Sequence, residues 1–117
     1  MTIDHDTREA LAGISAGRAE ALEQTLELRE SAFEASGLDA RSFSLVKIAT
    51  LIALDAPPAS YAWQVGNATE AGVSAADILG VLRAVAPQVG GPKVVAAAPE
   101  IMLALGMDLS EGADERL

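Results

Sequence analysis

One stretch of the sequence decides the fold: Glu70-Ala71-Gly72-Val73-Ser74-Ala75-Ala76-Asp77-Ile78. Gly72 can adopt the left-handed backbone conformation that ends a helix, so a preceding helix is expected to stop here. Ser74 is a typical N-cap residue, and Asp77 takes the place that a glutamate has in a capping box. The stretch therefore predicts that one helix ends, the chain turns, and a new helix begins at Ala75.

The same kinds of signal divide the rest of the chain into helices. Asp55-Ala56-Pro57-Pro58 ends one helix and allows another to begin, because proline is tolerated in a first turn. Gly90-Gly91-Pro92 breaks the chain again. The first predicted helix is short, is capped by Asp6 and is interrupted at Gly13 and Gly17. The second covers 18–35 and stops at Gly37, and the third is capped by Asp39 and runs through Leu54. Three more helices cover 58–71, 75–89 and 93–105. No strand pattern occurs, so we expect an all-α helical bundle of about six helices.

The length and the charge distribution predict one domain with an acidic exterior. A chain of 117 residues has the size of a typical domain, so a single domain over 1–117 is expected. Residues 1–39 hold nine acids and three bases, whereas residues 40–99 hold three acids and four bases. We expect acidic amphipathic helices over 1–36, a helical core over 37–106 and a polar tail over 107–117. The nearly neutral, apolar middle segment is expected to be buried, either in the core or against other subunits, which favours a homo-oligomer.

The net charge of -9 disfavours nucleic acids and membrane surfaces as partners, because both attract clustered lysine and arginine. The longest apolar run, residues 48–54, is far shorter than a helix that spans a bilayer. Residues 1–6 lack the basic and apolar regions of a signal peptide. We therefore expect a cytoplasmic protein.

Two residue types that carry much catalytic chemistry are nearly missing. The sequence has no cysteine, and its one histidine, His5, is expected in a polar N-terminal tail. Thiol nucleophiles, thiol redox chemistry and most zinc sites are therefore not expected. Five glutamates resemble a carboxylate metal site: Glu20, Glu23, Glu27, Glu30 and Glu34. Because Arg29 lies among them, we interpret them as a solvated helix face. No metal and no cofactor is expected.

Several segments together resemble the carboxymuconolactone decarboxylase family, which includes the alkyl hydroperoxidase D-like proteins. They are Gly37-Leu38-Asp39-Ala40-Arg41-Ser42, Ile52-Ala53-Leu54, residues 70–78, Val81-Leu82 and residues 86–92. The most specific are Ala-Gly-Val-Ser-x-x-Asp-Ile and Ala-Pro-x-x-Gly-x-Pro, and the likeness extends over about residues 37–105. The resemblance implies an all-helical subunit that assembles as a trimer or hexamer, with its active pocket beside the helix that follows Leu54.

The sequence departs from this family where the family's chemistry lies. Redox members carry Cys-x-x-Cys followed by His on the helix after Leu54, and those positions fall here at Pro58, Tyr61 and Gln64. The decarboxylase branch uses the histidine without the cysteines, and the family's frequent glutamate on the preceding helix falls at Ser44. A peroxidase needs a thiolate, and a glutamine cannot protonate a carbanion as a histidine can. Peroxidase activity is not expected, and any catalysis must use other residues.

The polar residues that remain near the implied pocket form two stripes. Ser44 and Lys47 share one face of a helix, and Tyr61, Gln64 and Asn67 form a similar stripe on the next. In the functional interpretation, Lys47 anchors a carboxylate or acts as a general base, Tyr61 donates a proton, and Gln64 orients the substrate. In the structural alternative, Lys47 extends to solvent or pairs with an acid. The residues predicted to contact the substrate are Ser44, Trp63 and Asn67.

Two functions from different classes fit these residues. The first is a cofactor-free lyase or proton-transfer enzyme for a small carboxylate or lactone, with Lys47 and Tyr61 in place of the usual pair. The second is a non-catalytic oligomer that binds a ligand or a partner protein, in which Trp63 anchors an interface or the core. Lys47 distinguishes them: a closed pocket shared with Tyr61 or Gln64 favours the enzyme, whereas contact with solvent or with an acid such as Glu70 favours the scaffold.

Overall fold

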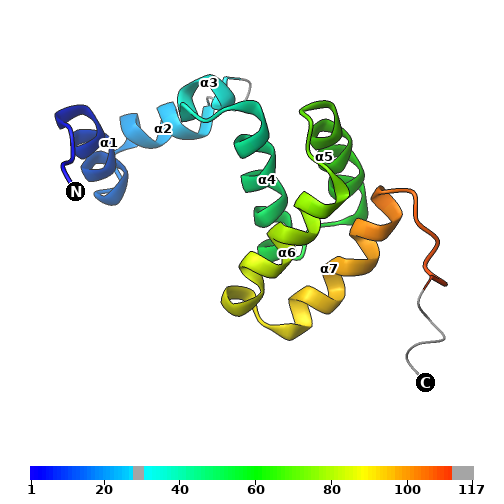
Figure 1. Ribbon diagram of the computed structural model, residues 1–117. Helices are drawn as coiled ribbons and strands as arrows, with labels where there is room; N and C mark the ends of the chain where they lie inside the picture. Colours follow the sequence, from blue (N-terminus) through cyan, green and yellow to red (C-terminus); the bar gives the residue numbers. More distant parts are fainter. Residues whose placement is uncertain (28–30, 112–117) are drawn as a thin grey trace. The chain divides into compact units, whose positions relative to one another are not determined.

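A computed structural model describes residues 1–27 and 31–111, apart from the side chains of residues 22, 23, 26 and 27. Over these residues the chain forms seven α-helices and no strand, which confirms the predicted all-α class (Figure 1). The helices are α1 His5–Ser15, α2 Ala19–Glu27, α3 Ala32–Ser36, α4 Ala40–Leu54, α5 Pro58–Glu70, α6 Ala75–Val89 and α7 Gly91–Ala104. None of these described helices is long and apolar enough to cross a bilayer. The chain divides into two compact units, Met1–Leu38 and Asp39–Leu117, and the single domain stays a prediction.

Helix α1 in the N-terminal unit begins earlier than predicted. Its N-cap is Asp4 and not Asp6, because the carboxylate of Asp4 accepts hydrogen bonds from the backbone N–H and the hydroxyl of Thr7, both at 2.8 Å. His5 is therefore the first residue of a helix and not part of a segment before it, although its side chain is exposed at the polar N-terminal end, as predicted. Asp6 lies in the first turn, where its negative charge interacts favourably with the positive end of the helix dipole.

Gly13 lies within α1, although the sequence predicts an interruption there. A Cβ atom at this position would lie 3.1 Å from the Cβ of Ala21, so the missing side chain lets α1 and α2 pack closely. The turn after α1 instead contains Gly17, whose φ of 67° is left-handed. Contact across the two helices, which local patterning does not reveal, explains the wrong prediction.

The single helix predicted over 18–35 is two helices, α2 and α3. Ser31, the N-cap of α3, departs from helical geometry with a φ of -113° and a ψ of 14°. Residues 28–30 between the helices lie outside the described residues. Gly37 ends α3 in the left-handed conformation, as the sequence predicts.

The helices of the C-terminal unit begin at or close to their predicted positions. Asp39 caps α4 by accepting a hydrogen bond from the backbone N–H of Ser42 at 2.7 Å. Ser74 and Asp77 form both hydrogen bonds of a capping box at the start of α6. Helix α7 begins two residues before the predicted start at Lys93, because Pro92 fits a first helical turn.

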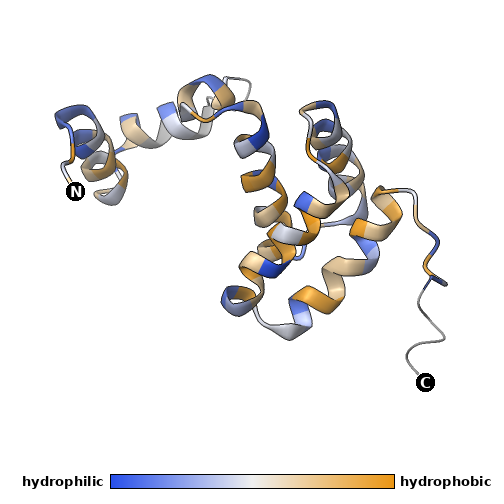
Figure 2. Ribbon diagram, viewed as in Figure 1, coloured by the Kyte–Doolittle hydropathy of each residue, from blue (hydrophilic) through white to orange (hydrophobic). Residues whose placement is uncertain are grey.

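A core of small aliphatic side chains holds α4, α5, α6 and α7 together. Helix α4 packs against each of the other three, and α7 also packs against α5 and α6. Figure 2 shows hydrophobic residues concentrated along α4, α6 and α7. The buried residues are Ile48, Ile52, Tyr61, Val65, Ala68, Val73, Ile78, Ala97 and Ile101. Tyr61 is the one aromatic residue among them, so aliphatic packing dominates the core.

Only one face of α4 is buried within a single chain, although apolar residues occur all around this helix. Ile48 and Ile52 have no exposed surface, whereas Val46 is 53% and Leu54 is 72% exposed. The expectation that the whole middle segment is buried is therefore not met inside one chain. On the neighbouring helix α5, Trp63 is also 72% exposed. Apolar side chains of this size, exposed close together in sequence, are typical of surfaces that contact a partner.

Candidate functional site

Lys47 and Gln64 line one hollow where α4 packs against α5. Together with Thr50 and Leu51 they bound a space of about 210 Å³. Lys47 and Thr50 are three residues apart on α4 and so share a face of that helix, while Gln64 comes from α5. The structure thus brings together two of the three residues predicted to be catalytic, although their catalytic roles stay predictions.

The charge of Lys47 has an aromatic neighbour and forms no ion pair among the described residues. Its Nζ lies 5.1 Å from the ring centroid of Phe43, within the range of a cation–π interaction. No described carboxylate, including Glu70, forms an ion pair with it. The hydroxyl of Thr50 donates to the carbonyl of Val46 at 2.9 Å, which leaves its oxygen as an acceptor. The hollow therefore offers an unneutralised ammonium group, an amide and a hydroxyl oxygen.

Tyr61 lies in the core and is not part of the lining of this hollow. Its side chain is 2% exposed. Burial raises the pKa of the Tyr61 hydroxyl, and the negative charges of Asp55 and Glu100 raise it further. A phenol with a raised pKa is a weaker acid, so this environment makes Tyr61 a poorer proton donor than a solvated tyrosine.

The residues predicted to contact the substrate lie outside the lining of the hollow. Ser44 is half-buried on α4, and Trp63 and Asn67 are exposed on α5. The predicted stripe of Tyr61, Gln64 and Asn67 passes from buried through half-buried to exposed. Because an α-helix has 3.6 residues per turn, steps of three residues drift around its axis. A stripe that looks continuous in sequence therefore does not face one pocket.

A second hollow lies between α5 and α7, and sequence reasoning missed it. It has a volume of about 280 Å³ and is lined by Pro58, Ala59, Ala62, Glu100, Leu103 and Ala104. Glu100 is half-buried and is the one charged residue in this lining. The available signal was a single acid within the otherwise apolar run over residues 94–105. Pro58, in the same lining, occupies the position that the family resemblance assigns to a reactive cysteine.

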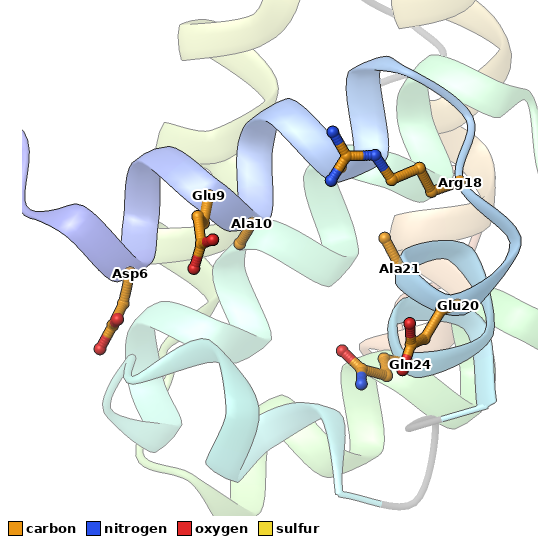
Figure 3. Close-up of a pocket in the computed structure, with 8 residues that line it drawn as sticks. Asp6, Glu9, Ala10, Arg18, Glu20, Ala21 and Gln24 are labelled. Carbon is orange, nitrogen blue, oxygen red and sulfur yellow. The ribbon is translucent and has the colours of Figure 1, made fainter.

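Two further hollows have different chemical character. One, between α6 and α7, has a volume of about 380 Å³ and an apolar lining: Ala75, Ala76, Leu79, Leu82, Ala98, Ile101, Met102, Leu105 and Met107. The other lies within the N-terminal unit, between α1 and α2, and has a volume of about 430 Å³ (Figure 3). Its lining is mostly polar: Asp6, Glu9, Ala10, Gly13, Arg18, Glu20, Ala21 and Gln24. Neither contains a residue of the predicted site.

Three possible metal ligands gather at the start of α1. His5, Asp6 and Glu9 each place one ligand atom within 4.8 Å of the others, and all three side chains are exposed. Nε2 of His5 lies 3.4 Å from Oε2 of Glu9. The two residues are four positions apart on α1, so they are neighbours on one solvated face of the helix. Of the predicted glutamate face, Glu20 and Glu34 are exposed, and the side chains of Glu23, Glu27 and Glu30 lie outside the described residues. The expectation that no metal binds stays a prediction.

Comparison with known proteins identifies the family. The sequence model of the carboxymuconolactone decarboxylase family matches residues 19–101, which is more than half of the chain. This range contains α4, α5, α6 and the four residues that line the Lys47 and Gln64 hollow. No curated protein and no solved structure matches the chain. From the family match and the all-helical structure, we conclude that the chain belongs to the carboxymuconolactone decarboxylase family.

Proposed function

We propose that this protein is a divergent, cofactor-free member of the family that acts on a small carboxylate or lactone as a lyase or proton-transfer enzyme. The observation that supports this function best is the hollow shared by Lys47 and Gln64. The chain has no cysteine, so a thiol peroxidase mechanism has no nucleophile. The cytoplasm, expected from the sequence, is the proposed location.

Each group of the hollow has a role in this proposal. The ammonium of Lys47 anchors a carboxylate, because no described acid neutralises it and the Phe43 ring holds it at 5.1 Å. Gln64 donates an amide N–H to a carboxylate or lactone oxygen and so orients the ligand. The Thr50 oxygen accepts a hydrogen bond from the ligand.

Tyr61 contributes less to this proposal than the sequence predicts. Its ring is buried, it does not line the hollow, and its pKa is raised by burial, Asp55 and Glu100. We therefore assign substrate binding to Lys47 and Gln64 and keep Tyr61 as a proton donor only for a substrate that reaches past this lining. Ser44, Trp63 and Asn67 have no part in the hollow.

The test is a turnover assay with a matched lysine control. Purified protein is incubated with short-chain keto acids and lactone carboxylates, and loss of substrate and release of carbon dioxide are followed by NMR. Lys47→Ala should abolish turnover and leave the assembly unchanged, whereas Lys93→Ala, at the chain's other lysine and outside the hollow, should retain it. Unchanged turnover in Lys47→Ala would refute the role of Lys47.

A non-catalytic role as an oligomeric binding protein is the second candidate. The observation that favours it is the exposed apolar surface of the C-terminal unit, where Leu54 and Trp63 are each 72% exposed. The proposed assembly is a homo-oligomer, a trimer or hexamer, that binds a small molecule or a partner protein. Size-exclusion chromatography with light scattering gives the mass. An oligomer that binds lactones and carboxylates without converting them would favour this candidate over the enzyme.

A further inference from the structure

The hollow between α5 and α7 combines one acid with apolar walls. Pro58, Ala59 and Ala62 come from α5, Leu103 and Ala104 from α7, and Glu100 also comes from α7. Glu100 is half-buried, so its carboxylate is partly removed from water. A carboxylate in such surroundings is favoured when a cation or hydrogen-bond donors compensate for the lost hydration.

The described part of the chain supplies little of that compensation. No described lysine, arginine or histidine forms an ion pair with Glu100. At the beginning of α5, Pro58 has no backbone N–H and so cannot donate a hydrogen bond to Glu100. Glu100 is the one charged residue of this lining. The site is therefore negatively charged and has no protein cation of its own among the described residues.

We infer that this hollow binds a small primary ammonium compound with a short apolar chain. The ammonium group pairs with the carboxylate of Glu100, and the apolar chain packs against Pro58, Ala62 and Leu103. A volume of about 280 Å³ suits a compound of only a few carbon atoms. This site is separate from the Lys47 hollow, which has the opposite charge, so the two proposals can fail independently.

The experiment is an NMR titration of the full-length, isotope-labelled chain with n-butylammonium, n-butanol and butyrate. Butylammonium should shift the amide signals of Ala59, Ala62 and Glu100 with roughly millimolar affinity, as expected for so small a ligand. Butanol, which has the same apolar chain without the charge, should bind about tenfold more weakly or not at all. Butyrate should leave these signals unchanged.

Two variants show whether Glu100 is the group that recognises the ammonium. Glu100→Gln should weaken butylammonium binding about tenfold, the loss expected when a charged partner becomes neutral. Glu70→Gln, at an exposed acid at the end of α5, should leave it unchanged. Ala62→Leu fills the hollow and keeps the acid, so it should also abolish binding while the helical circular dichroism spectrum is retained.

Three outcomes would overturn the inference. The first is that none of the three compounds shifts the signals of this hollow. The second is that butanol binds as well as butylammonium, because the acid would then have no role in recognition. The third is that the protein forms an oligomer that does not bind butylammonium, and that Glu100→Gln lowers the mass of this oligomer. A basic side chain of a second copy would then occupy the hollow.

Discussion

Arg41 and Asp77 join the first turn of α4 to the first turn of α6. Nη2 of Arg41 lies 2.8 Å from Oδ1 of Asp77, while Oδ2 of Asp77 accepts a hydrogen bond from the backbone N–H of Ser74 at 2.9 Å. One carboxylate thus completes a capping box and links two helices. Both residues belong to the segments that resemble the family, so part of this resemblance lies in residues that hold the helices together.

The capping box at α6 should contribute measurably to stability. Ser74→Ala removes the oxygen that accepts a hydrogen bond from the Asp77 N–H at 3.1 Å. We expect a loss of about 1 kcal/mol in the free energy of unfolding, typical of an N-cap serine. Urea denaturation followed by circular dichroism measures it. Ser110→Ala, at an exposed position outside the helices, is the control, and equal stability of the two variants would contradict the prediction.

The chain should lose stability in acid through its helix caps. Hydrogen bonds from backbone N–H groups at helix starts, those of Thr7, Ser42 and Ser74, lower the pKa values of Asp4, Asp39 and Asp77 below 3.8. The unfolded chain therefore binds protons first, so this contribution is present above the ordinary pKa and is lost as the pH falls through the lowered values. The denaturation midpoint should be constant between about pH 5 and about pH 9 and fall below about pH 4. A smaller fall in Asp77→Asn is expected, and an identical fall would contradict the role of Asp77.

Tyr61 should titrate above the ordinary tyrosine pKa of 10.0, because burial and the charges of Asp55 and Glu100 disfavour its anion. Since it is the chain's one tyrosine, ultraviolet difference spectroscopy reports on it alone. Its contribution to stability is present below pH 10 and is lost as the pH rises through the raised value. Asp55→Asn and Glu100→Gln should each lower the titration midpoint of Tyr61. A midpoint at or below that of a solvated tyrosine would disprove this description of its environment.

Trp63 should report on assembly. As the chain's one tryptophan and 72% exposed within it, Trp63 gives a fluorescence signal that changes if α5 forms the proposed subunit interface. We expect blue-shifted emission in the oligomer, a red shift on dilution, and dissociation in Trp63→Ala, because large aromatic residues anchor interfaces. Leu109→Ala, at an exposed apolar residue outside the helices, should assemble normally. Emission typical of a solvated indole in an intact oligomer would place the interface elsewhere.

The helix boundaries of the C-terminal unit could be predicted because the signals are local. The caps at Asp39 and Ser74 and the left-handed Gly72 depend on a few neighbouring residues. The predicted helix boundaries are wrong where two residues could each cap the same helix, or where a contact with another helix determines the structure. Asp4 and Asp6 are both suitable caps, and Gly13 lies within α1 because it packs against Ala21 on another helix.

The candidate site was predictable only in part, for a similar reason. Helical spacing placed Lys47 and Gln64 on neighbouring helices, and they do line one hollow. The burial of Tyr61 depends on how the helices of the C-terminal unit pack together, and the hollow at Glu100 forms where α5 meets α7. Residue spacing reveals neither. An isolated acid in an apolar helix was the one sequence signal for the second hollow.

The most direct test of the central claim is an NMR titration with butyrate and γ-butyrolactone of the natural chain, Lys47→Ala and Lys93→Ala. We predict that both compounds shift the amide signals of Lys47, Thr50 and Gln64, that Lys47→Ala abolishes the response to butyrate, and that Lys93→Ala keeps it. If these signals do not respond, or if Lys47→Ala binds butyrate as the natural chain does, the Lys47 and Gln64 hollow is not the site of function.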